Sequence, residues 1–240
     1  MPSIRTIAVH EIVQQTFPRP PRAGDEIAKA IGRAIDGALS QIGHQVRLGR
    51  RPTVGGMRAL AERLLDEEIE TAAEVLPPEQ RIRVLEEIDG VLLAFRASEI
   101  FGLARPKTRV ILIGGEVGVY AQPDYWDGAR RFFEMKSYLA IPPPPDVALQ
   151  MRLFQLAFPG LESILICLDR HARPVSTHTL RLPAPTEAET VEALRLADRL
   201  GREHGQPKVL EYLEGPFVSY PRPAPPPEPE PVADGGRPVG

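Results

Sequence analysis

The N-terminal part of the chain contains three successive helical patterns, and this feature limits most strongly what the chain can fold into. In residues 25–42, apolar side chains recur at near-helical spacing, and residues 57–75 and 79–100 have helical character as well. Pro77 and Pro78 separate the last two segments, because proline breaks a helix. The sequence therefore predicts three helices before any confident strand.

The character of the sequence changes after about residue 105. Residues 108–128 and 129–140 are rich in β-branched and aromatic side chains and are interrupted by Gly and Asp-Gly, as is typical of adjacent strands. The order of these segments predicts a mixed α/β fold, in which helices flank a mixed central sheet and a helical segment precedes it. The other predicted elements are strands over 161–170 and 174–183 and helices over 146–158 and 186–205.

A chain of 240 residues suits one domain with a substantial core. We expect a single domain over residues 1–220, with its N-terminal helical part at about 25–100 and its sheet core at about 105–220. Residues 221–240 are dominated by Pro, Glu and Gly and are predicted to form a disordered proline-rich tail. Such a tail is either a docking segment for a protein partner or a plain disordered terminus.

Composition excludes several classes of protein. The net charge of −3 argues against a protein that coats nucleic acid through bulk positive charge, although it allows a locally basic groove. The single Cys167 excludes an internal disulfide and a four-cysteine zinc or iron–sulfur site within one chain. No apolar run approaches the roughly 18 residues of a membrane span. The N-terminal sequence lacks a signal-peptide core, so we expect a cytoplasmic protein without a membrane partner.

The stretch PDYWDGARRFFEMKSY, residues 123–138, contains the strongest candidates for chemistry. If residues 131–139 form a strand, alternation places Glu134 and Lys136 on one face, opposite a mostly apolar face. Asp124 can reach the first face if the intervening turn makes a hairpin. Two adjacent carboxylates repel each other and stay ionised cheaply only if a cation lies between them. Mg²⁺ and Mn²⁺ prefer such oxygen ligands.

Taken alone, Glu134-Met135-Lys136 is most consistent with a solvated strand face. Two further features favour a site. Lys136 is one of only four lysines among 29 basic residues, and its compact ammonium group suits a catalytic amine better than the arginine that this chain otherwise uses. In addition, the helix predicted soon after the strand carries Gln150.

These residues resemble the signature of the PD-(D/E)XK nuclease superfamily, which consists of Pro-Asp, a spacer, and Asp or Glu-x-Lys on the following strand. The matching residues are Pro123-Asp124 and Glu134-x-Lys136. The resemblance covers roughly residues 25–205 and implies a restriction-endonuclease-like core. Many members of the RecB-like branch bind an iron–sulfur cluster through four cysteines, and the single cysteine of this chain excludes that cluster.

Two further motifs of the RecB-like branch are matched less closely. The branch has Gln, three residues and then Tyr on a helix after the strand, and this chain has Gln150 and Phe154. The branch also opens with a helix that reads Gly-x-x-hydrophobic-His. Here Gly32 and Ile35 are followed by Asp36, which can bind a metal through oxygen or lie on an ordinary solvated face.

The resemblance implies a metal-dependent hydrolysis of phosphodiester bonds in DNA. Asp124, Glu134 and the backbone carbonyl of Met135 would hold one or two Mg²⁺ or Mn²⁺ ions, with Asp36 as a further candidate ligand. Lys136 would orient or help to deprotonate the attacking water and would stabilise charge in the transition state. Gln150 would orient the lysine, the water or the nucleic acid.

Nucleic-acid binding without sequence preference requires positive charge near such a site. The candidate contacts to phosphates are Arg47, Arg50, Arg51, Arg130 and Arg131, and ordinary surface arginines are an equally good explanation. Tyr125 and Trp126 could stack on an unpaired base. Packing in the core is the alternative for Trp126.

Three hypotheses follow from the sequence. The first is a metal-dependent DNA nuclease of repair, recombination or defence against foreign DNA. The second is an inactive protein of the same fold that binds nucleic acid or a protein partner, with Asp36 and Phe154 as signs of divergence. The third is an unrelated α/β interaction domain whose charges imitate the motif.

Overall fold

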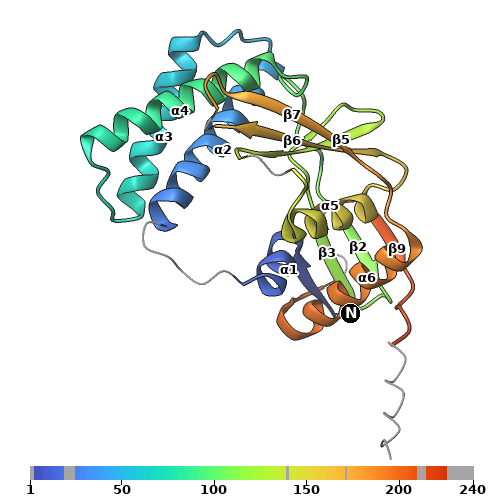
Figure 1. Ribbon diagram of the computed structural model, residues 1–240. Helices are drawn as coiled ribbons and strands as arrows, with labels where there is room; N and C mark the ends of the chain where they lie inside the picture. Colours follow the sequence, from blue (N-terminus) through green and yellow to red (C-terminus); the bar gives the residue numbers. More distant parts are fainter. Residues whose placement is uncertain (1–2, 19–24, 139–140, 171, 210–214, 226–240) are drawn as a thin grey trace, which may run out of the picture.

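The computed structural model describes residues 3–18, 25–138, 141–170, 172–209 and 215–225 (Figure 1). This part of the chain has a mixed α/β fold with helices and two mixed sheets. The helices are α1 (Val9–Thr16), α2 (Asp25–Arg47), α3 (Val54–Thr71), α4 (Pro78–Ala97), α5 (Pro145–Ala157) and α6 (Glu187–His204). The strands are β1 (Ser3–Ala8), β2 (Arg109–Ile113), β3 (Val117–Ala121), β4 (Tyr125–Trp126), β5 (Arg131–Lys136), β6 (Glu162–Asp169), β7 (Ser176–Leu182), β8 (Gln206–Val209) and β9 (Phe217–Tyr220).

Helices α2, α3 and α4 form a helical layer at one end of the molecule (Figure 1). Thr53 begins α3 as its N-cap, because its hydroxyl accepts a hydrogen bond from the Gly56 amide at 3.1 Å. Pro78 occupies the first turn of α4, where the missing amide hydrogen costs nothing. The three predicted helices are therefore present, but α2 continues to Arg47, beyond the predicted end at residue 42.

The first sheet, sheet A, has the strand order β8-β1-β3-β2-β9. Strand β1 pairs in parallel with β3 and antiparallel with β8, so the first described strand lies inside the sheet. Helices α1, α5 and α6 cover one face of sheet A, where apolar residues of β1, β2 and β3 are buried. The expectation that helices precede any strand is wrong, because β1 and α1 come first.

The second sheet, sheet B, has the strand order β4-β5-β6-β7, and its central strands β5 and β6 are buried on both faces. Phe132 packs on the side of α5, whereas Phe133 and Met135 pack against the helical layer. Helix α5 lies between the two sheets (Figure 1), and its Phe154 meets Phe132 edge-on with ring centroids 6.4 Å apart. The sequence predicts one central sheet, whereas the structure has two, which are linked by the connection between β3 and β4.

The end of the described chain runs along α6. Arg195 Nε of α6 donates a hydrogen bond to the Ala224 carbonyl at 2.8 Å, and Arg222 forms an ion pair with Glu116 at 2.8 Å. Residues 221–225 of the predicted tail therefore contact the folded part, and residues 226–240 lie outside the described residues. No helix in the described ranges is long and apolar enough to cross a membrane.

Candidate functional site

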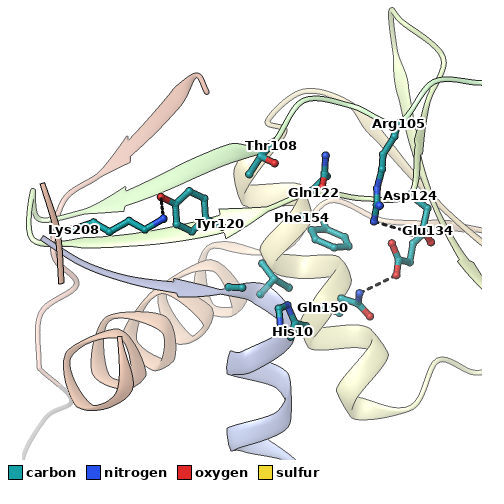
Figure 2. A pocket seen from close by; sticks show the side chains of 12 residues that line it. His10, Arg105, Thr108, Tyr120, Gln122, Asp124, Glu134, Gln150, Phe154 and Lys208 are labelled. Carbon is teal, nitrogen blue, oxygen red and sulfur yellow. Dashed lines mark hydrogen bonds and ion pairs between the residues drawn. The ribbon is translucent and has the colours of Figure 1, made fainter. Parts of the chain in front are cut away.

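Glu134 and Lys136 project from the same face of β5 toward α5, as the alternation of the strand predicts. Lys136 Nζ donates a hydrogen bond to Glu134 Oε1 at 2.8 Å and another to Gln150 Oε1 at 2.9 Å. Gln150 Nε2 in turn donates to Glu134 Oε1 at 2.8 Å (Figure 2). The three side chains therefore form a closed hydrogen-bonded triangle between β5 and α5.

Asp124 reaches β5 from the connection between β3 and β4. Its Oδ2 accepts a hydrogen bond from the Met135 amide at 2.9 Å. The hairpin that brings it there is built by Asp127, whose Oδ1 accepts from the amides of Ala129, Arg130 and Arg131, and by Gly128 with φ of 84°. The sequence WDGAR thus folds as a hairpin, and Asp124 lies beside Glu134.

The Met135 carbonyl faces the same side of β5 as Asp124. In a strand, the amide and the carbonyl of one residue point to the same edge, and the Met135 amide points to Asp124. Strand β4 pairs only as far as Tyr125 with Phe133, so it does not cover this edge at Met135. The carbonyl that the family resemblance assigns as a ligand is therefore on the side where the carboxylates gather.

Asp36 of α2 approaches the same group of charges from the helical layer. It lines a small cavity of about 110 Å³ together with Asp124, Met135 and Arg105. Desolvation by the surrounding protein, and then the charge of Asp124, raise the pKa of Asp36 to about 6, while Lys136 and Arg105 oppose this shift. Asp36 remains exposed, so screening by water limits the energetic weight of the shift.

Glu134 is the most constrained charge of the site, since it is only 4% exposed. Burial and then the nearby charge of Asp124 raise the pKa of Glu134, although Lys136 opposes the shift. Burial favours the neutral form of Lys136, but the carboxylate of Glu134 outweighs it and the pKa of Lys136 is raised. The amine is therefore a cation at neutral pH and in this state stabilises negative charge.

The donor set suits a hard divalent cation, although it is sparse. No group of three or more His, Cys, Asp and Glu side chains with metal-binding geometry occurs within the described ranges. Yet the charge of Asp124 raises the pKa of both Asp36 and Glu134, so Asp124 lies close enough to repel each of the other two carboxylates. Two carboxylates and a carbonyl are sufficient protein ligands for Mg²⁺, which keeps several waters.

Arg105 belongs to the site, although sequence reasoning did not identify it. Its Nη2 lies 3.9 Å from Asp124 Oδ1, and it lines both the small cavity and a larger one. The larger cavity, of about 640 Å³, extends from Asp124 and Glu134 toward α1 and sheet A (Figure 2). Arg105 lies in an irregular segment before β2, where no sequence pattern marks it.

The predicted arginines are not gathered at the site. Arg47 lines the small cavity and donates to the Leu103 carbonyl at 2.9 Å. Arg131 is already held by Asp127 at 2.9 Å and by Glu99 at 2.8 Å. The other three predicted arginines are exposed and line neither cavity: Arg50, Arg51 and Arg130.

The two aromatic candidates for stacking differ in their accessibility. Tyr125 is 6% exposed and packs near Phe95, with ring centroids 6.0 Å apart, so the idea that it stacks on a base is wrong. Trp126 is half-buried, and its indole nitrogen is buried without a hydrogen-bond partner among the described residues.

Comparison with known proteins finds similarity only at the level of structure. No protein-family model matches the sequence, and no curated protein matches it. The protein SSO0001 is 14% identical with a TM-score of 0.38, and the alignment covers 85% of this chain and 79% of that one. A protein from Eubacterium rectale, described provisionally as an exonuclease, is 10% identical with a TM-score of 0.45, over 88% of this chain and 86% of the other. Structural similarity this distant does not bear on function, which must be inferred from the site itself.

Proposed function

We propose that this protein is a metal-dependent nuclease that hydrolyses phosphodiester bonds of DNA. The observation that carries the proposal is the hydrogen-bonded triangle of Glu134, Lys136 and Gln150 next to Asp124. These residues come from three separate segments of the chain and meet beside an open cavity. A buried ion pair is costly to form, and its presence at a cavity rather than in the core favours a functional role.

Asp124, Glu134 and the Met135 carbonyl would hold Mg²⁺ or Mn²⁺, and Asp36 would add a fourth oxygen ligand. When bound, such an ion would polarise the phosphoryl group and lower the pKa of a coordinated water. It would also balance the charge of the carboxylates, which Lys136 and Arg105 oppose in the protein alone.

The remaining residues would position the reacting groups and balance charge. Lys136 is a cation at neutral pH, so it would stabilise the charge that develops on the phosphate and orient the attacking water. Gln150 would hold Lys136 and Glu134 in register, since it contacts both. Arg105 would contribute a second positive charge beside Asp124.

The test is a cleavage assay on linear single-stranded and double-stranded DNA with Mg²⁺, Mn²⁺ or EDTA. Lys136→Met should lower the cleavage rate about 10²- to 10³-fold, the usual effect of removing one group that stabilises the transition state. Lys29→Met is the matched control, because Lys29 is exposed and pairs with Glu26 on the surface of α2. Cleavage in EDTA, or equal rates for the two variants, would contradict the proposal.

The runner-up is a catalytically inactive protein of this fold that binds nucleic acid or a protein partner. One observation favours it: Lys136 and Gln150 already satisfy Glu134 within the protein. In that case the wild-type chain would bind DNA in EDTA but would cleave none with any metal. Arg47, Arg50, Arg51, Arg130 and Arg131 are then the first surface residues to substitute.

A further inference from the structure

The larger cavity continues the proposed reacting centre along sheet A. It lies where the parallel strands β1 and β3 end, and Ala8 and Tyr120, which face each other in register, both line it. The crevice outside the carboxyl ends of parallel strands is a common ligand-binding place in α/β folds. Its opposite end is marked by Lys208 of β8 (Figure 2).

The acidic residues of the cavity wall lie at one end of it. Asp124 and Glu134 are the acidic residues of its lining, and both belong to the proposed reacting centre. The rest of the lining is neutral or basic and includes Arg105, His10 and Lys208. An anionic ligand that enters from the reacting centre therefore meets positive charge and hydrogen-bonding groups along its path.

Lys208 is held in place without being neutralised. Its Nζ lies 3.3 Å from the Tyr120 hydroxyl and 4.9 Å from the centroid of the Tyr120 ring. Among the described residues, its partners are the Tyr120 hydroxyl and ring rather than a carboxylate. Tyr120 thus fixes an ammonium group that has no acidic partner in the described part of the chain.

The size of the cavity decides between classes of ligand. About 640 Å³ falls within the roughly 300–1,000 Å³ of pockets that enclose small organic ligands. A duplex, whose major groove alone is about 12 Å wide, does not fit inside such a space. A short stretch of a single strand is narrow enough to enter it, and Arg105, Lys208 and the apolar Phe154 line the space that its phosphates and a base would occupy.

We infer that this cavity is a binding site for one strand of nucleic acid, which runs from Asp124 and Glu134 to Lys208. The inference rests on the proposed function, because it takes the reacting centre as one end of the path. Lys208 contacts a phosphate at the other end. The alternative role of Lys208 is to protect the edge strand β8 from pairing with another molecule, as lysines on edge strands often do.

The test measures binding in EDTA, so it gives a result even if the chain proves to cleave nothing. The probe is a labelled thymidine oligonucleotide of about 12 residues, within the roughly 4–16 nucleotides that single-strand-binding sites span. Lys208→Gln should weaken binding about threefold to tenfold and should reduce the slope of log affinity against log salt by about 0.7, the value for one phosphate contact on a single strand. Lys29→Gln should leave both quantities unchanged, and Lys208→Arg should restore the slope.

Two competitors separate the possible ligands. A duplex of the same length and thymidine monophosphate should each displace the probe at least about tenfold less well than the unlabelled oligonucleotide. Equal competition by the mononucleotide would show that the cavity binds a single nucleotide rather than a strand. Equal competition by the duplex would show that DNA binds outside the cavity. An unchanged salt slope in a folded Lys208→Gln variant, as judged by circular dichroism, would overturn the inference as well.

Discussion

Gln150 is the residue through which α5 controls the proposed reacting centre. It is the acceptor for one hydrogen bond from Lys136 and the donor of one to Glu134. Removing a hydrogen-bond donor from a buried carboxylate typically lowers the stability of a protein by about 1–3 kcal/mol. The geometry of both charged side chains therefore depends on an uncharged neighbour.

Gln150→Ala should accordingly reduce DNA cleavage about 10- to 100-fold, because Lys136 and Glu134 lose their common partner. Gln155→Ala is the matched control on the same helix. Gln155 bonds to Ser163 and to the Pro183 carbonyl, away from Asp124, so its loss should lower stability without a comparable loss of activity. Initial cleavage rates at saturating metal, together with thermal denaturation of both variants, decide the point.

Asp36 gives a prediction about stability and pH in metal-free protein. Its pKa is about 6 in the folded chain and 3.8 in the unfolded chain, so the folded state binds the proton more tightly. The stabilising effect of this proton is complete below pH 3.8 and is lost as the pH rises through about 6.

Asp36→Asn should therefore melt at nearly the wild-type temperature at about pH 4 and higher than wild type at about pH 8. Since Asp36 stays exposed, screening leaves a difference of about 1 kcal/mol or less, roughly 2–4 °C for a chain of this size. Thermal melts in EDTA at both values measure it. A difference that shrinks with rising pH would show that the charge of Asp36 is not destabilising.

Sequence alone could predict which side chains meet on β5, but it could not predict the walls around them. Strand alternation and the Asp-Gly turn are local features, and they predict that Asp124, Glu134 and Lys136 share a face. The position of Gln150 beside Lys136 was implied only by the family resemblance. Arg105 comes from an irregular segment, and Lys208 reaches the cavity only because β8 pairs with β1. Such long-range pairing leaves no local pattern.

At the level of elements, α6 packs against sheet A through a glycine. A Cβ atom added at Gly201 would lie 2.3 Å from Val117 Cγ1 of β3. Valine in a strand has little freedom at χ1, so the strand or the helix would have to move. The close approach of α6 to β3 therefore requires the absence of a side chain at this position.

Gly201→Ala should destabilise the protein by up to about 2 kcal/mol, because overpacking costs about 1–3 kcal/mol and the helix propensity of alanine returns about 1 kcal/mol. Gly32→Ala is the matched control in α2, where an added Cβ meets no atom within 4 Å. That variant should gain up to about 1 kcal/mol from propensity alone. Urea denaturation of both proteins tests the pair, and a stabilised Gly201→Ala would contradict the packing argument.

Elements with strong local signals were predictable, whereas their assembly was not. The helices at 78–97, 145–157 and 187–204 lie within a few residues of their predicted bounds, because proline, capping residues and periodicity mark them. Strand β1 has an alternating burial pattern of its own, but it is six residues long and merges into α1 without a turn signal. The division into two sheets occurs at Gln122-Pro123, and alternation does not specify which strands pair.

For the whole molecule, the proposed metal ligands come from both the helical layer and sheet B. Asp36 lies on α2, Asp124 on the connection between the sheets and Glu134 on β5. A cation held by these groups would cross-link the helical layer to sheet B, which share an apolar cluster. Binding to the folded state alone stabilises a protein by about 2.7 kcal/mol at a ligand concentration 100 times the Kd.

Mn²⁺ at that saturation should therefore raise the melting temperature of the wild-type chain by roughly 5–10 °C. Asp124→Asn should remove most of this shift, while Lys29→Gln should keep it. Differential scanning fluorimetry with Mn²⁺ and with EDTA provides the measurement. An equal shift in Asp124→Asn would place the metal elsewhere.

The pairing of β1 with β8 also has a consequence for the order in which the molecule is assembled. Arg5 donates a hydrogen bond to the Gly205 carbonyl, 200 residues away, and β1 lies inside sheet A. The helical layer can fold on contacts between successive helices, but contacts between distant residues form slowly. During synthesis, β1 and α1 precede their partner strands and must wait for β3 and then for β8. The cavity wall that contains Lys208 is therefore closed only after β8 has been synthesised.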